Sequence, residues 1–164
     1  MPIGFRYASR EDLPLIVSTY NSTIASQVAT ADLEPVSVAS RIDWFEAHSP
    51  AKRPIWIVSK NGNYAGWMSF NSFYGRPAYD GTVEVSIYIE ENLRGGGIGK
   101  ACLEQAAREA KALGIHTLLG FIFGHNEISL KLLYKFGFRE WGHLPEVANM
   151  NGTLRDLIIV GYKV

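Results

Sequence analysis

The chain has 164 residues, of which 47% are hydrophobic and 20% are charged. This length suits a single domain over residues 1–164 with a sizeable core, and the balance excludes a disordered chain. Sixteen basic and sixteen acidic side chains cancel, which argues against a nucleic-acid partner because such binding depends on neutralising phosphates.

The first third of the chain predicts a strand and two helices. Residues 3–7 have the composition of a short strand, and residues 9–20 begin with a capping pattern and continue with an apolar helical face. Residues 21–31 are polar and small, so we expect a loop or a loose helix there. A second helix is predicted over residues 37–48, with a serine cap at its start and Pro50 beyond its end.

Two strands joined by a tight turn come next. Residues 55–58 and 64–70 are rich in β-branched and aromatic side chains, and Asn61-Gly62-Asn63 has the chemistry of a hairpin turn. Residues 74–81 are predicted to form a loop that leads into a central strand.

The centre of the chain combines a strand, a glycine-rich turn and a helix. Residues 83–89 alternate as a strand does, residues 94–99 contain four glycines in five positions, and residues 100–110 favour a helix. Bare backbone N–H groups at the positive end of a helix dipole bind phosphate. A P-loop is excluded because Ala101 stands where Ser or Thr is needed, and the dinucleotide-binding spacing is absent. The alternative is a flexible turn that only caps the helix.

The remaining residues predict a strand, a short helix and the last strands. Gly114 can end the central helix, and residues 116–123 form the next predicted strand. Residues 126–137 predict a helix that starts at an asparagine cap and ends at a glycine, and residues 138–162 supply the last strands. The predicted order is β-α-α-β-β-β-α-β-α-β-β, an α/β (α+β) arrangement with a mixed sheet covered by helices.

Two motifs resemble the GNAT superfamily of N-acetyltransferases. The first is Arg-x-x-Gly-x-Gly at residues 94–99, similar to its pyrophosphate-binding motif, and the second is the block of Asn126, Ser129, Leu132 and residues 136–138. The resemblance covers nearly the whole chain and implies the acyl-CoA N-acyltransferase fold, with a mostly antiparallel sheet flanked by helices. It implies acetyl-CoA as co-substrate, held by Ile87, Tyr88, Ile89, Arg94, Gly95, Gly96, Gly97, Ile98, Gly99, Asn126 and Ser129.

Finer features resemble the phosphinothricin N-acetyltransferase branch of that superfamily. They are Tyr20-Asn21, Arg76-Pro77 and residues 41–45, 82–89 and 155–157. The branch implies a small amino-acid-like amine substrate, such as phosphinothricin, methionine sulfoximine or methionine sulfone, acetylated in detoxification or resistance, and it implies a homodimer. It also implies that an Arg-Pro pair holds the substrate's carboxylate. The implied substrate site consists of Arg76, Pro77, Ala78, Glu84, Val85 and Ser86.

Glu84 is the predicted general base for direct attack by the amine. An α-amino group with a pKa near ~8 is mostly protonated at pH 7, so a base must accept a proton. Alternation along the strand places Glu84, Ser86 and Tyr88 on one face, and the branch's base falls on Glu84. We expect burial among Val83, Val85 and Tyr79 to raise the pKa of Glu84. The alternative is an exposed carboxylate or a structural ion pair.

The resemblance also implies how the thioester of acetyl-CoA is activated. It implies that N–H groups of residues 87–89 polarise the carbonyl where a bulge splays this strand from its neighbour. Many members place a tyrosine where this chain has Leu133, and Tyr134 is rotated about 100° from that position. No residue is therefore assigned to protonate the departing thiolate.

Other residue types narrow the setting. The four histidines lack metal-ligand spacing, so no metal is expected. The first residues lack a signal core, no run suits a membrane span, and the single Cys102 cannot form an internal disulfide, so we expect a cytoplasmic protein without a membrane partner. Two alternatives stay open: an acetyltransferase for a polyamine or peptide N-terminus, and a non-catalytic acyl-CoA-binding module.

Overall fold

The computed structural model describes residues 2–164, and within them the strands form one seven-stranded sheet in the order β1-β2-β3-β4-β5-β7-β6. The strands are β1 (Ile3–Tyr7), β2 (Ile55–Lys60), β3 (Asn63–Ser72), β4 (Thr82–Ile89), β5 (Thr117–Phe123), β6 (Arg139–Met150) and β7 (Thr153–Lys163). The α-helices are α1 (Leu13–Ser22), α2 (Ile42–Glu46), α3 (Ile98–Ala112) and α4 (Glu127–Phe136). Every neighbouring pair of strands is antiparallel except β4 and β5. The predicted mixed, mostly antiparallel sheet with flanking helices is confirmed.

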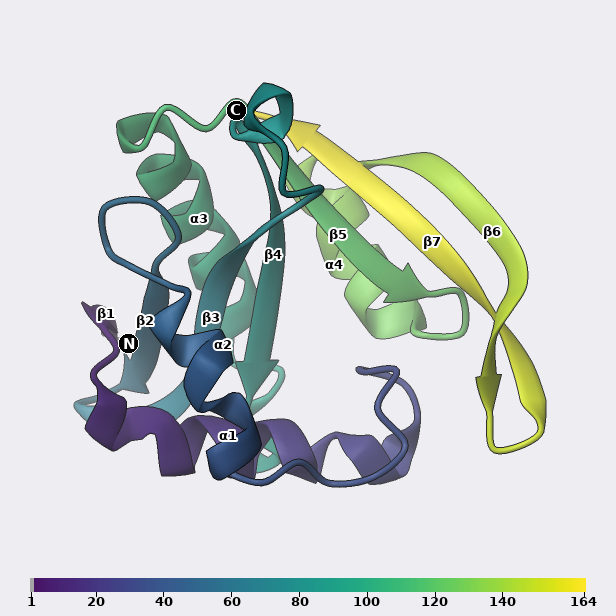
Figure 1. Cartoon of the computed structure of the whole chain (residues 1–164), viewed down its shortest axis with the longest axis horizontal. Coiled ribbons are helices and arrows are strands. Elements are labelled where there is room, and N and C mark those ends of the chain that lie inside the picture. The colour runs from purple at the N-terminus through teal and green to yellow at the C-terminus, as the bar shows by residue number, and fades with distance from the viewer. Residues whose placement is uncertain (1) are drawn as a thin grey trace.

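Helices cover both faces of the sheet (Figure 1). Alternating strand residues separate two cores, because successive side chains point to opposite faces. Val58, Met68 and Val83 are fully buried in the core shared with α3 and α4. Ile57 and Trp67 are buried in the core shared with α1 and α2. The central strands are thus buried on both sides.

Local signals in the sequence are realised as hydrogen bonds. The Ser9 N–H donates to Oδ2 of Asp12 at 2.7 Å, which forms the expected capping box ahead of α1. Asn61 and Gly62 adopt φ values of 53° and 80° in the turn between β2 and β3, as a type I′ hairpin requires. The Asn126 side chain accepts the N–H of Ser129 at the start of α4.

The second helix is shorter than predicted. Ser37 does cap it, since its Oγ accepts the Ser40 N–H at 3.1 Å. The chain first forms a 3-10 turn over Ala39–Arg41, and only Ile42–Glu46 is α-helical. The loop of residues 21–31 also contains helical structure, because α1 extends to Ser22 and a 3-10 turn follows at Ile24–Ser26.

β4 and β5 pair only near their starts. The pairing runs from Thr82↔Thr117 to Glu84↔Leu119, after which the two strands diverge (Figure 1). The Glu90 N–H donates to the carbonyl of Ala65 on the β3 side at 2.9 Å. Because peptide groups alternate between the two edges of a strand, the N–H groups of Ile87 and Ile89 face the gap toward β5.

The expected splay of the central strand is therefore present, but its predicted cause is wrong. The register of β4 with β3 is continuous from Gly66↔Ile89 to Ser72↔Val83, so that pairing contains no bulge. The register shift lies instead between β2 and β3, beside Val58. The unpaired edge of β4 arises because β5 turns away to pair with β7 over its full length.

Candidate active site

A cavity of about 350 Å³ opens on the α1–α2 side of the sheet, above β4. Its apolar walls come mainly from the two helices and β3, and they are Ile16, Val17, Val36, Trp44 and Trp67. Its polar lining is Tyr20, Arg41, Asn71, Glu84, Ser86 and Tyr88. The predicted sharing of one strand face by Glu84, Ser86 and Tyr88 is confirmed, and that face is the floor of the cavity.

Glu84 is a half-buried carboxylate with no neutralising partner. Within residues 2–164 its side chain makes no ion pair or hydrogen bond, which disfavours the structural ion pair considered above. Burial raises the pKa of Glu84 above its ordinary value. Of the three neighbours expected to bury this carboxylate, Val83 and Val85 pack in the core on the opposite face, and Tyr79 is 43% exposed and does not line the cavity.

Hydrogen bonds fix the floor of the cavity to α2. Asn71 lies directly opposite Glu84 on β3, and its Nδ2 donates to Oγ of Ser86 at 3.1 Å. Nε2 of His48 lies 2.9 Å from Oδ1 of Asn71, while its Nδ1 lies 2.7 Å from the carbonyl oxygen of Trp44. These contacts hold the end of α2 against the strands that carry Glu84.

The glycine-rich turn presents backbone groups rather than side chains. Gly95 and Gly97 have φ values of 79° and 80°, and a Cβ at either position would meet nothing within 4 Å. Their backbone conformation, not crowding, therefore favours glycine. Gly97 is the N-cap of α3 and no side chain of the described chain caps this helix, so its first N–H groups stay available. The turn fits a diphosphate.

Two neighbours of the turn were not anticipated. A Cβ on Gly99 would lie 2.7 Å from Cδ2 of Leu132, so Gly99 lets α3 approach α4. A Cβ on Gly96 would lie 2.8 Å from Nζ of Lys60, which places an ammonium group beside the turn. Lys60 is the last residue of β2 and is far from the turn in sequence, so no local sequence pattern predicts its position there. Arg94 is adjacent to the turn in sequence, and its Nε donates to the carbonyl of Ile89 at 3.3 Å.

The second motif lies at the open end of the β4–β5 gap. The Asn126 side chain caps α4 through Ser129 and also donates to the carbonyl of Val28 at 3.4 Å. Leu133 is 8% exposed and belongs to the core. Tyr134 is 37% exposed and does not line the cavity, as its rotation around the helix predicts.

The predicted substrate loop is not brought into the cavity. Arg76 precedes an exposed 3-10 turn, Pro77–Tyr79, and neither Arg76, Pro77 nor Ala78 lines the cavity. The side chain of Val85 packs on the opposite face, in the core with α3, so its backbone alone can reach a substrate. The arginine that lines the cavity is Arg41, which the sequence analysis mentioned only within the segment 41–45 that resembles the phosphinothricin N-acetyltransferase branch.

Residues 2–164 contain neither a membrane-spanning helix nor a cluster of metal-binding side chains. No helix within residues 2–164 combines the length and apolar character needed to cross a membrane. The same residues bring together no group of three or more His, Cys, Asp or Glu side chains that could hold a metal ion. Burial raises the pKa of Cys102 to about 12, so this thiol is a neutral core group.

The gap between β4 and β5, the glycine-rich turn and the Glu84 carboxylate agree with the family that the sequence matches. The acetyltransferase (GNAT) family matches residues 18–138. The chain belongs to this family and is an enzyme of the N-acetyltransferase class.

Particular relatives refine this class. The chain is 52% identical over 157 residues to the "Putative phosphinothricin acetyltransferase YwnH" of Bacillus subtilis, covering 95% of this chain and 96% of that protein. It is 32% identical to the L-methionine sulfoximine/L-methionine sulfone acetyltransferase of Pseudomonas paraeruginosa, with coverages of 96% and 92%. It is similar to the solved structure of a phosphinothricin acetyltransferase from Sinorhizobium meliloti in complex with AcCoA. That match has a TM-score of 0.93, 28% identity, and coverages of 100% and 89%.

Proposed function

We propose that this enzyme transfers the acetyl group of acetyl-CoA to the free amine of a small amino-acid-like substrate. Phosphinothricin, methionine sulfoximine and methionine sulfone are the substrate types, since the names of its relatives carry them. The observation that carries the proposal is Glu84: an unpaired carboxylate on the cavity floor, on the strand whose free edge faces the gap. Acetylation of such compounds would serve detoxification or resistance.

The backbone would hold the coenzyme. The N–H groups of the glycine turn and of the first turn of α3 suit its diphosphate, with Arg94 and Lys60 as nearby cations. The free N–H groups of Ile87 and Ile89 suit the thioester carbonyl oxygen. One donor of this kind contributes about 3–4 kcal/mol to transition-state stabilisation in enzymes where it has been removed. Acetyl-CoA, when bound, supplies the activated acyl group.

Glu84 would act on the amine. It accepts a proton from the substrate ammonium, and its raised pKa makes it a stronger base than an exposed glutamate. The neutral nitrogen attacks the carbonyl carbon, so that a C–N bond forms and the C–S bond breaks. A second proton then leaves the nitrogen for sulfur or solvent. We assign no residue to this last transfer, because Leu133 occupies the usual tyrosine position and is buried.

Thiol release with a panel of amines tests this proposal. The panel contains phosphinothricin, methionine sulfoximine, methionine sulfone, ordinary amino acids, spermidine and a short peptide. We expect turnover with one or more of the first three. Glu84→Gln should lower kcat/KM by about 10²–10⁴-fold near neutral pH, and less at high pH where the amine deprotonates unaided. Glu104→Gln is the matched control, because the Glu104 side chain lies on the exposed side of α3, and its activity should be unaffected.

Several outcomes would contradict the proposal. Turnover confined to spermidine or to the peptide would favour another amine, and absence of turnover with saturable acetyl-CoA binding would indicate a binding module. Unchanged activity of Glu84→Gln would remove its role as a base. The cavity already disfavours a polyamine, because Arg41 lines it.

The proposal also covers the setting of the enzyme. We propose that residues 1–164 form one acetyltransferase domain, with the single sheet as support, and that it acts in the cytoplasm, where one buried free thiol is stable. We propose a homodimer as well. The β6–β7 hairpin carries exposed Leu144, Val147 and Leu154, of which Val147 and Leu154 lie beyond its pairing with β5; a second copy could cover this surface.

A further inference from the structure

The cavity contains one cationic side chain among the residues that the structure describes. Arg41 and Glu84 are its two charged lining groups. The two tyrosines beside them stay neutral, because burial and a hydrogen bond to Asp32 raise the pKa of Tyr20, and burial raises that of Tyr88. The cavity lining therefore carries one positive and one negative group, and Asp32, which does not line the cavity, pairs with the positive one at 3.2 Å.

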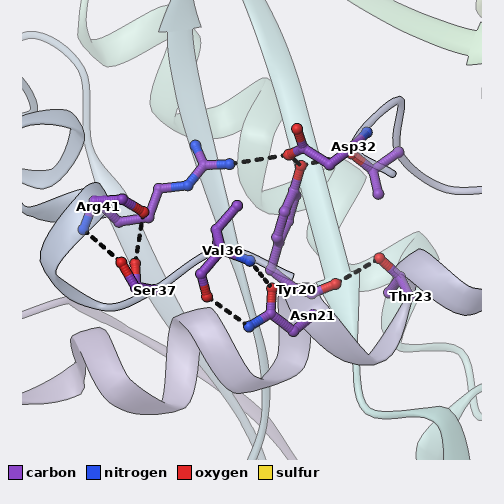
Figure 2. Close-up of polar contacts among 9 residues, drawn as sticks. Tyr20, Asn21, Thr23, Asp32, Val36, Ser37 and Arg41 are labelled. Carbon is purple, nitrogen blue, oxygen red and sulfur yellow. Dashed lines mark hydrogen bonds and ion pairs between the residues drawn. The ribbon is translucent and has the colours of Figure 1, made fainter. Parts of the chain in front are cut away.

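Arg41 is held in place by groups from α1 and the following loop (Figure 2). Its guanidinium donates to Oδ2 of Asp32 at 3.2 Å, and its Cζ lies 4.9 Å from the ring centroid of Tyr20. The Tyr20 hydroxyl donates to the same carboxylate and lies 2.6 Å from Oγ1 of Thr30. Trp44 adds a second ring, at 6.0 Å. Stacking and one hydrogen bond fix the orientation of the guanidinium.

The segment behind Arg41 is also anchored. Asn21, at the end of α1, exchanges two hydrogen bonds with Val36, one from its Nδ2 at 2.8 Å and one to its Oδ1 at 2.9 Å (Figure 2). Val36 itself lines the cavity. These bonds fasten the loop between α1 and α2 to the wall, so the position of Arg41 is set by the fold.

Most donors of the Arg41 guanidinium remain unused. A guanidinium has five N–H donors, and within residues 2–164 its hydrogen bond goes to Asp32 alone. Its side chain is 28% exposed, so the remaining donors are accessible from the cavity. A fork of parallel N–H groups matches the two oxygens of a carboxylate.

We propose that Arg41 binds the α-carboxylate of the amino-acid substrate while Glu84 faces its amine, and that Asp32 is a positioning residue for Arg41. This inference rests on the proposed function. We assign the α-carboxylate rather than the distal sulfone to Arg41, because a carboxylate can accept charge-assisted hydrogen bonds from the N–H groups that Asp32 does not use, whereas a sulfone is neutral. Arg76 is the candidate that the sequence predicted for this contact, and it lies outside the cavity.

A pair of amines isolates the carboxylate. Methionine sulfone and 3-(methylsulfonyl)propan-1-amine share the amine and the sulfone, and only the first has a carboxylate. Thiol release by the full-length protein should favour methionine sulfone. Arg41→Gln should raise its KM by about 10- to 100-fold, the range for a charge-assisted hydrogen-bonded pair, and should change kcat/KM for the decarboxylated amine less than about threefold. Arg41→Lys should recover part of the loss.

Control variants separate binding from folding. Arg108→Gln removes an exposed arginine of α3 and should leave both substrates unaffected. Asp32→Asn should raise KM for methionine sulfone with little change in kcat or in KM for acetyl-CoA, whereas a merely structural defect would affect both amines. Arg76→Ala should keep the preference for the carboxylate.

The outcomes distinguish this inference from the proposed function. If the wild-type protein releases no thiol with any amine, the proposed function fails. If the wild type is active and Arg41→Gln loses activity equally on both amines, or Arg76→Ala alone abolishes the preference, the inference about Arg41 is overturned while the function stands. If Arg41→Gln does not fold, Arg41→Lys decides: a preference for the carboxylate that is fully retained, with unchanged KM, contradicts the role of a guanidinium fork.

Discussion

Gly99 provides the sharpest test of how the fold shapes the coenzyme site. It lies in the first turn of α3, where a Cβ would stand 2.7 Å from Cδ2 of Leu132 on α4. Carbon atoms in contact are normally about 3.5–4.0 Å apart, so Gly99→Ala must displace one partner. If α3 moves, the N–H groups of the glycine turn move with it, and these are the groups proposed to bind the diphosphate.

The size of the effect follows from two opposing terms. Overpacking a core contact costs about 1–3 kcal/mol, and replacing a helical glycine by alanine returns roughly 0.5–1 kcal/mol. The clashing atom is the end of a flexible, partly buried side chain, so the lower part of the first range applies. The difference of the two terms is a destabilisation of about 0.5 kcal/mol for Gly99→Ala, or roughly 1–2 °C in Tm for a chain of this size.

A double-mutant cycle with Leu132→Ala isolates the contact. Thermal unfolding of the two single variants and the double variant should show a coupling of about 1 kcal/mol, because the new methyl group fills space that Leu132 vacates. The KM for acetyl-CoA should rise in Gly99→Ala and fall again in the double variant. Gly97→Ala is the matched control, since a Cβ there meets nothing within 4 Å, and its effect should add to that of Leu132→Ala. Additivity of the Gly99 pair within about 0.5 kcal/mol, with unchanged KM, would refute the reasoning.

Three further predictions concern charged groups. The acid limb of kcat/KM should have a midpoint above the ordinary glutamate pKa, because the proposed base Glu84 would act deprotonated and burial raises its pKa; a pH profile of Glu84→Gln should lack this limb. Lys60→Ala should raise KM for acetyl-CoA several-fold without changing KM for the amine, because its ammonium lies beside Gly96; equal changes in both would place it elsewhere. Hydrogen bonds from Arg6 lower the pKa of Asp12, so stability should fall as the pH drops from the ordinary pKa of aspartate through the lower folded value. Urea unfolding between pH 5 and pH 2 should show this loss in the wild type and less of it in Asp12→Asn.

Much of the fold could be predicted from the sequence because its signals are local. The Asn61-Gly62 turn, the cap at Asn126 and the strand–glycine–helix unit around Gly97 each depend on residues that are neighbours in the chain. The period-two pattern of β4 correctly separates the core-facing Val83 from the cavity-facing Glu84. Propensity and periodicity determine such features before any tertiary contact forms.

The walls of the cavity were beyond this kind of prediction. Arg41 becomes a cavity residue only because Asp32 and Tyr20 hold it, and these contacts join three separate segments. Lys60 reaches the glycine turn from the end of β2, and β3 lies between β2 and β4 in the sheet. The loop around Arg76 was predicted to bind substrate by resemblance, but no local signal states whether a loop folds toward a cavity or away from it.

The two halves of the site differ in how they tolerate sequence change. The proposed coenzyme half would consist mainly of backbone N–H groups, so it would depend on a few glycines and on the divergence of β5 from β4. The proposed substrate half consists of side chains: β4 supplies Glu84 and Ser86, and α1 and the segment that follows it supply Tyr20 and Arg41. Substitutions at Tyr20, Asp32 or Arg41 can therefore change the charge offered to a substrate while the coenzyme stays bound. It follows that these three side chains, more than the loop ahead of β4, should distinguish an enzyme for amino acids from one for cationic amines.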